Sequence, residues 1–162
     1  MSNYINPSAG VSGAQVTLKV YHTNRTADST GLSVPSLQNV TINNANDVFT
    51  WSQLDSGSKK QVATTATNSL SMNLVVDPTS FFGTGSGSTA AASGIFGLSK
   101  NKTIIEFDLV LGDDNAGANT KTISGFGYVT GLAPTVSAES PVWVSPCTIT
   151  VTGDFSVATT SP

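Results

Sequence analysis

The chain has 162 residues and a net charge of −3, and only 10% of its residues are charged, against about 25% in an ordinary soluble domain. Serine and threonine supply 22 positions each while 38% of residues are hydrophobic, which favours a folded chain with an uncharged polar surface over a disordered one. The chain has only seven basic residues, so we expect no nucleic-acid-binding surface. No apolar run is long enough to span a membrane, and residues 1–13 lack the pattern of a signal peptide, so we expect neither a membrane anchor nor a secretory leader.

Alternation of hydrophobic and polar residues predicts β-strands along most of the chain. In the first such segment, Val16, Leu18 and Val20 alternate with polar or amphipathic residues. In chain order, the expected strands are residues 16–21, 31–38, 38–42, 48–53, 69–76, 105–111, 120–129, and 142–144 with 147–151. The pattern predicts an all-β fold of seven or eight mostly antiparallel strands.

Turn residues and one helix separate these strands. The segments 55–57 and 112–117 are expected to be turns, Asp77-Pro78 to end a strand, and Gly125 with Gly127 to allow a bulge. Residues 89–98, rich in alanine, are the one expected helix, which is short. The domain is predicted at residues 14–157, with an N-terminal arm at 1–13, a Gly/Ser/Ala-rich insertion at 83–98 and a C-terminal tail at 158–162.

The sequence contains few residues that would support catalysis. His22 is the only histidine, no G-x-S-x-G motif occurs, and His22 is expected to be structural. Residues 85–90 match G-x-G-x-x-A but lack a strand–helix context, so a linker is the preferred interpretation. We expect no enzyme activity and no cofactor.

Metal, disulfide and sugar sites are similarly weak predictions. Cys147 is the single cysteine, which excludes an internal disulfide and a multi-cysteine zinc site and fits a reduced cytoplasm. The acidic segment 113–117 is interpreted as a solvated turn rather than a calcium loop. Trp51, Trp143 and Tyr128 offer a sugar-stacking platform, although aromatic residues on strands lie more often in a core or an interface.

The order of several segments carries a family resemblance. Residues 33–41 (SVPSLQNVT) precede residues 50–60 (TWSQLDSGSKK), and an alternating strand at 69–77 then ends in Asp-Pro. Near the C-terminus, residues 124–130 (SGFGYVT) precede a strand at 144–153 that closes in V-T-G. Together these segments resemble the lambda-type tail tube (major tail) proteins of long-tailed bacteriophages over most of residues 14–157.

The resemblance implies a structural virion protein whose subunit folds as a two-sheet β-sandwich or barrel. Such proteins form hexameric rings that stack into a tube through which DNA passes, so the expected partner is the chain itself, with sheath, tape-measure and tail-terminator proteins as further partners. The expected location is the virion tail, assembled in the bacterial host cytoplasm. Ring assembly is head-to-tail, so each subunit needs two different contact faces.

Two sets of residues follow as site hypotheses from that resemblance. Carboxylates on the polar side of the strand at 105–111, together with polar residues that we expect on the neighbouring strand, are assigned to the channel lumen, where they would repel phosphate. The segment 41–60 and the terminal arms are assigned to contacts between subunits and rings. The lumen set is Glu106, Asp108, Ser71 and Asn73, and the contact set is Trp51, Leu54, Asp55, Lys59 and Lys60.

The alternative function is a β-sandwich binding module that recognises carbohydrate or decorates a capsid. For the lumen set, the alternative is a solvated outer face of the sheet. The segment order favours the tail tube, since the three aromatic residues named above are not clustered in the sequence.

Overall fold

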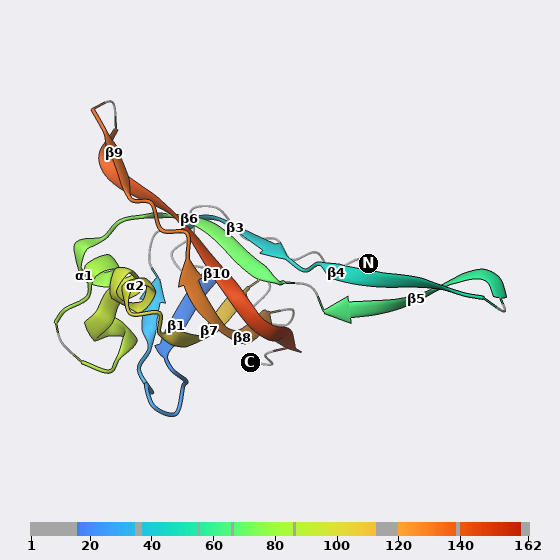
Figure 1. Cartoon of the computed structure of the whole chain (residues 1–162). Coiled ribbons are helices and arrows are strands. Elements are labelled where there is room, and N and C mark those ends of the chain that lie inside the picture. The colour runs from blue at the N-terminus through green and yellow to red at the C-terminus, as the bar shows by residue number, and fades with distance from the viewer. Residues whose placement is uncertain are drawn as a thin grey trace, which may run out of the picture.

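The computed structural model describes residues 16–34, 37–54, 56–65, 67–85, 87–112, 120–138 and 140–159. Within these ranges the chain forms ten strands and two helices (Figure 1). The strands are β1 (Val16–His22), β2 (Leu32–Val34), β3 (Leu37–Asn43), β4 (Asn46–Gln53), β5 (Ser56–Thr65), β6 (Ser69–Val75), β7 (Ile104–Leu111), β8 (Lys121–Thr130), β9 (Thr135–Ser137) and β10 (Ser140–Thr159), and the helices are α1 (Pro78–Phe82) and α2 (Ala90–Lys100). The all-β prediction is confirmed.

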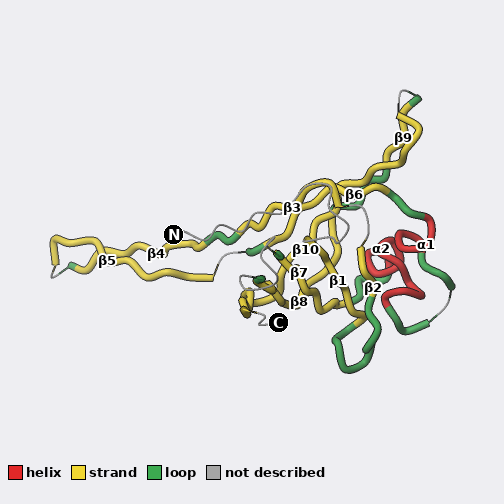
Figure 2. Tube along the Cα trace, turned by 180° about the vertical axis from the view of Figure 1, so that it is seen from behind, coloured by secondary structure: helices red, strands yellow, loops and turns green. Residues whose placement is uncertain are grey.

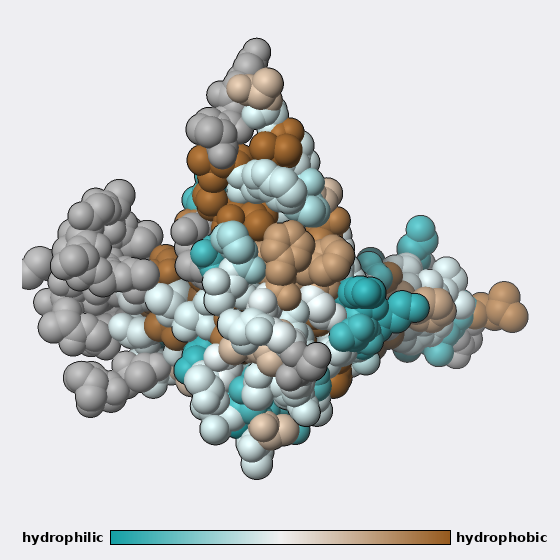
Figure 3. All heavy atoms as spheres, turned by 90° about the vertical axis from the view of Figure 1, so that its left-hand side faces the viewer, coloured by the Kyte–Doolittle hydropathy of each residue, from teal (hydrophilic) through white to brown (hydrophobic). Residues whose placement is uncertain are grey.

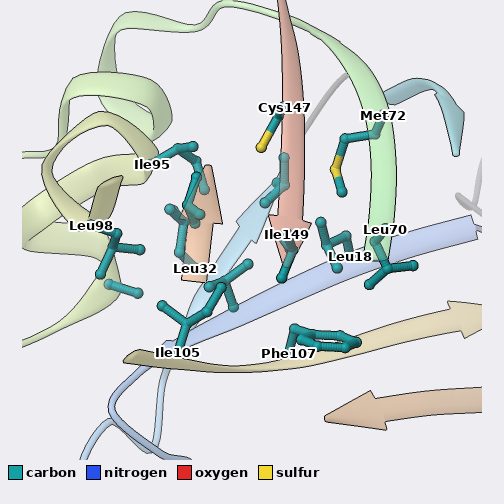
Figure 4. Close-up of a cluster of buried hydrophobic side chains, with 14 of the residues drawn as sticks. Leu18, Leu32, Leu70, Met72, Ile95, Leu98, Ile105, Phe107, Cys147 and Ile149 are labelled. Atoms are coloured by element: carbon teal, nitrogen blue, oxygen red, sulfur yellow. The ribbon is translucent and has the colours of Figure 1, made fainter. Parts of the chain in front are cut away.

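Eight of the strands belong to one antiparallel sheet. Its order is β2-β1-β7-β8-β10-β6-β3, and β9 pairs with β10 off this path. The sheet curls, so that β6 and β10 face β1 and β7 across the core (Figure 4). The barrel-like body is therefore one curled sheet, and the second sheet is the two-stranded β4–β5 hairpin.

The core lies on the concave side of this curl. Alternate residues of the strands point into it, and Leu18, Leu70, Phe107 and Ile149 are each at most 1% exposed (Figure 4). Complete burial of one such side chain contributes about 1.5–3 kcal/mol relative to exposure. The alternation read from the sequence therefore identifies the core-facing side of β1, β6, β7 and β10 correctly.

Helix α1 begins where the sequence predicted the end of a strand. β6 does end at Val75, but Asp77 then caps α1, because its carboxylate accepts a hydrogen bond of 2.8 Å from the Ser80 backbone N–H. Pro78 occupies the first helical turn, where its missing N–H costs nothing. The structure thus has one helix more than the residue pattern predicts.

Helix α2 is the expected helix, and it covers one open side of the curled sheet. The Thr89 hydroxyl caps its start by accepting a hydrogen bond of 3.2 Å from the Ala92 N–H. Ile95 and Leu98 are buried in the same cluster as the strand residues (Figure 4). The segment expected as an insertion therefore contributes directly to the core.

Strand β10 is longer than the sequence pattern indicated. It runs without a break through Ser145-Pro146 and extends to Thr159, which includes the first two residues of the expected C-terminal tail. The pairing of β8 with β10 shifts between Thr152 and Ser156, so the extra residues lie on β10, opposite Gly125. The expected bulge is present at Gly125, although the partner strand supplies the additional residues.

The β4–β5 hairpin extends away from the curled sheet, as Figures 1 and 2 both show. All eight residues of β4 are exposed. The residue pattern predicts one short strand in this long polar segment, and β5 was not predicted. The expected N-terminal arm, Asp55 and the acidic segment 113–117 lie outside the described residues.

Candidate functional site

The convex face of the main sheet carries mostly hydroxyl and amide side chains. Strand register places Ser71 of β6 beside Thr148 of β10, and Thr148 beside Thr130 of β8. The hydroxyls of Thr130 and Thr150 lie 3.0 Å apart, a hydrogen bond across the two strands. Two exposed aromatic residues of β8, Phe126 and Tyr128, lie on the same side of the sheet. We call this surface the polar face, defined by Asn39, Thr41, Ser71, Asn73, Ser124, Thr130, Thr148, Thr150, Glu106 and Asp108.

One end of the polar face holds a cluster of charges. The Arg25 Nη2 atom lies 3.1 Å from Glu106 Oε1 and 2.7 Å from Asp108 Oδ1. The Arg25 backbone N–H donates to Glu106 Oε2 at 2.7 Å, and the Ser124 hydroxyl donates to Asp108 Oδ1 at 2.8 Å. Lys19 is paired with Asp108 in the strand register, so two carboxylates and two cations meet in this cluster.

Tyr21 packs against the same cluster. The Arg25 guanidinium lies 5.2 Å from the centre of the Tyr21 ring, within the range of a cation–π contact. Burial and then the neighbouring Asp108 carboxylate raise the pKa of the Tyr21 phenol above its usual 10.0, so it stays neutral.

The four residues of the predicted lumen set share one face but not one pair of strands. Glu106 and Asp108 lie on β7, whose partners are β1 and β8. Ser71 and Asn73 lie on β6, which β8 and β10 separate from β7. The expectation that these strands are neighbours was wrong, because residue alternation determines the face of a side chain but not the order of strands.

The predicted contact set lies on the β4–β5 hairpin. Register pairs Trp51 with Lys60 and Ser52 with Lys59, so the two lysines point to opposite faces of the ribbon. Leu54, at the end of the hairpin, is fully exposed. Asp55, the remaining member of the set, is outside the described residues.

An apolar groove beside α1 was not predicted. It encloses about 330 Å³ between the end of β6, the start of α1 and the first part of β10. Figure 3 shows hydrophobic atoms along the arm of β9 and β10 on this side of the molecule. We call this feature the α1 groove, and Val76, Pro78, Phe82, Val142 and Trp143 line it.

One weak signal for this groove is present in the sequence. Trp143 stood out as an aromatic residue on a strand, but its neighbours in the groove are distant in the chain. Trp143 and Phe82 are 46% and 49% exposed, so the groove is an uncovered apolar surface.

His22 has structural contacts. Its ring Nδ1 lies 3.0 Å from the Thr23 hydroxyl, and its backbone N–H donates to Asp28 Oδ2 at 3.0 Å. Among the residues that the structure describes, no group of three or more His, Cys, Asp or Glu side chains is placed to hold a metal ion. In the same part of the chain, no helix has both the length and the hydropathy of a membrane span.

The chain resembles known proteins in its three-dimensional structure. No family model matches the chain, and no curated protein matches its sequence. The fold is similar to a chain of the C6-symmetric tail of an empty gene transfer agent particle, with a TM-score of 0.60 and 13% identity over 92% of this chain and 99% of that one. This chain has the same fold as that tail protein.

Two further structures extend this similarity. One is a chain of a native gene transfer agent virion, with a TM-score of 0.58, 12% identity, and coverage of 92% of this chain and 99% of that one. The other belongs to the sheath–tube complex of an extracellular contractile injection system, with a TM-score of 0.55, 13% identity, and coverage of 90% and 88%. At these identities the comparisons establish the fold alone.

Proposed function

We propose that this chain is a structural, non-enzymatic subunit of a phage-like tail tube, in which hexameric rings stack around a DNA-conducting channel. The observation that carries the proposal is the similarity over nearly the full length of both chains to a subunit of a tail with C6 symmetry. The sequence resemblance to lambda-type major tail proteins is an independent line of support for a tube. The proposed location is the virion tail, after assembly in the host cytoplasm.

The polar face is proposed to line the channel. DNA must pass through without binding, which favours a surface without unpaired cations. Hydroxyls and amides are frequent on this face, Arg25 contacts two carboxylates, and Lys19 is paired with Asp108 in the strand register. Glu106 and Asp108 would then be repeated six times around the wall and repel phosphate, while Ser71 and Asn73 would supply uncharged wall further along the sheet.

The β4–β5 hairpin is proposed to make contacts between subunits or rings. Its residues Trp51, Leu54, Lys59 and Lys60 extend beyond the body of the subunit, and two-stranded ribbons are marginally stable alone in water. We propose that Asp55, which lies outside the described residues, belongs to the same contact. The edge strands β2 and β3 would join neighbouring subunits within a ring, since uncovered sheet edges favour strand pairing.

The low charge of the chain is consistent with such an assembly. Soluble monomers need dispersed surface charge, and this chain has little of it. Hydroxyl and amide groups suit subunit interfaces because they form hydrogen bonds without the desolvation cost of buried ions. The chain itself is therefore the main proposed partner, with sheath, tape-measure and terminator proteins as the others.

Negative-stain electron microscopy of the concentrated purified chain tests this proposal. We expect six-membered rings or hollow rods, with a hole at the centre of end-on views. A chain that stays monomeric at every concentration, or that binds glycans as a monomer, would contradict a tube and favour a carbohydrate-binding or capsid-decoration module.

A further inference from the structure

We propose that one face of the β4–β5 hairpin, formed by Phe49, Trp51, Lys60 and Val62, seats in the α1 groove of a second copy of this chain. This inference rests on the proposed function and names the surface on the neighbouring subunit that receives the hairpin. It joins two uncovered surfaces that the structure places at opposite ends of the molecule (Figures 1 and 2).

The two faces of the hairpin differ in chemistry. Register pairs Phe49 with Val62 and Trp51 with Lys60, and side chains of paired residues lie on the same face. The Phe49 and Trp51 rings stack with their centres 5.9 Å apart. We call this side the aromatic face; the opposite face carries Val48 with Ala63, Thr50 with Gln61, and Ser52 with Lys59.

The aromatic face is exposed to solvent in the isolated chain. Phe49 and Val62 are 59% and 48% exposed, and the stacked Trp51 is 36% exposed. An eight-residue strand is about 27 Å long, so the ribbon extends well past the sheet that anchors it. Burial of this face against another surface would stabilise the ribbon, whose own two strands supply little core.

The α1 groove offers a matching apolar surface. A backbone hydrogen bond joins two sides of the groove, because the Val76 N–H donates to the Trp143 carbonyl at 2.8 Å. The Phe82 ring packs edge-on against the Phe81 ring and at a tilt against the Phe96 ring, with ring centres 5.0 and 5.7 Å apart, respectively. A concave apolar site with fixed aromatic walls suits aromatic anchors from a partner.

The charges at the two surfaces are opposite. Lys60 lies on the aromatic face, and Asp77 is the residue between Val76 and Pro78, two residues that line the groove. Hydrogen bonds from the Ser80 hydroxyl and backbone N–H lower the pKa of the Asp77 carboxyl, which therefore remains ionised. An ammonium at the edge of the inserted face would meet a carboxylate at the edge of the receiving groove.

A second copy is the occupant because the hairpin cannot bend back to its own groove. The hairpin and α1 extend from opposite sides of the curled sheet, as Figure 1 shows. Pairing of two different surfaces is a head-to-tail contact, and such contacts generate rings or filaments rather than closed dimers. The docking therefore supplies the type of contact that a tube requires.

Two substitutions on adjacent residues test the inference. Lys60→Glu places a carboxylate on the aromatic face, whereas Gln61→Glu places one on the other face of the same strand. We expect Lys60→Glu to abolish rods and Gln61→Glu to retain them. Adding Asp77→Asn, which keeps a capping oxygen, should partly restore assembly of the Lys60→Glu variant. Equal loss of rods in both single variants, or in neither, would overturn the docking.

Cross-linking locates the contact directly. Phe49→Cys with Val142→Cys in one chain, treated with a short bis-maleimide, should give a ladder of linked chains on a denaturing gel. Val48→Cys with Val142→Cys is the matched control, because Val48 lies on the other face of the ribbon. A mixture of the two single-cysteine chains, Phe49→Cys and Val142→Cys, should stop at dimers.

The outcomes separate this inference from the proposed function. Rods without a ladder from the Phe49 pair, or with an equal ladder from the Val48 pair, overturn the docking and leave the tube intact. A ladder from a chain that never forms rings or rods supports the docking and contradicts the tube. Neither rods nor a ladder contradicts both.

Discussion

The Asp28 carboxylate accepts a hydrogen bond of 2.7 Å from the backbone N–H of Ala90, the first residue of α2. The two residues are 62 positions apart, and the same carboxylate also accepts bonds from the N–H groups of His22 and Gly31. Asp28 is 2% exposed, so it joins the loop after β1 to the start of α2 from within the fold. A negative charge at a helix N-terminus also interacts favourably with the helix dipole.

Replacement of Asp28 should destabilise the fold. Asp28→Ala leaves three N–H donors without their acceptor, two of them buried, and one hydrogen bond to a charged group is worth about 1.5–3 kcal/mol. We expect the free energy of unfolding to fall by about 3 kcal/mol in urea titrations. Asp47→Ala, on the exposed β4 strand, is the control and should change it by less than about 0.5 kcal/mol. Equal stability of the two variants would show that the three bonds contribute little.

The contribution of Asp28 should also depend on pH. Burial raises the pKa of its carboxyl, but the N–H donors of Ala90, His22 and Gly31 outweigh that effect, and the pKa lies below the ordinary 3.8. A carboxyl whose pKa is lower in the folded state stabilises the fold above its unfolded pKa, and that stability is lost as the pH falls through the folded pKa. The difference in unfolding free energy between the wild type and Asp28→Asn should therefore be constant at neutral pH and shrink below about pH 3.8. A difference that grows with acidity would contradict this assignment.

Removal of Arg25 should destabilise the charge cluster of the polar face in a salt-dependent way. The Asp108 side chain is 11% exposed and would lose its ion-pair partner, but the Arg25 side chain is 52% exposed and solvent screens it. We expect Arg25→Ala to lower the unfolding free energy by about 1 kcal/mol at low salt and by less at high salt. Lys100→Ala, at the exposed end of α2, is the charge-matched control. Salt independence of the Arg25 effect would indicate lost packing on Tyr21 instead.

Sequence alternation predicted the strands that have one buried and one exposed face. β1, β6 and β7 bury alternate residues, so their hydrophobic pattern repeats every second position. β5 was missed because its hairpin is not packed against the core, and its sequence therefore lacks that repeat. α1 was missed because Asp77-Pro78 was interpreted only as the end of a strand, although Asp followed by Pro is also a signal for the start of a helix.

The candidate surfaces were predictable to different degrees. The face that carries Glu106 and Ser71 follows from residue parity, a local property of each strand. The separation of β6 from β7 depends on the order of strands in the sheet, which no local pattern encodes. The α1 groove joins Val76 and Phe82 to Trp143, distant in the chain, and only the fold brings them together.

Gly94 should be essential for the contact between α1 and α2. Its φ is 65° and its ψ is 170°, a conformation that costs other residues about 1–3 kcal/mol, and a Cβ at this position would overlap the Gly83 nitrogen and the Phe81 carbonyl. We expect Gly94→Ala to lower the melting temperature by several degrees, whereas Gly57→Ala, where a Cβ meets nothing within 4 Å, should leave it unchanged. A neutral Gly94→Ala would mean that the two helices can separate without loss of the core.

Cys147 should report the opening of the core. The side chain is 2% exposed on β10, and burial raises the pKa of its thiol to about 12, so the reactive thiolate is almost absent at neutral or mildly alkaline pH. We expect thiol reagents to label the native chain only at the rate of global unfolding, and immediately in denaturant. Asp28→Ala and Gly94→Ala should accelerate labelling in proportion to their loss of stability, because each raises the population of the open state. Rapid labelling of the native wild type would show that β10 separates from β6 without global unfolding, and the core would then not be a single cooperative unit.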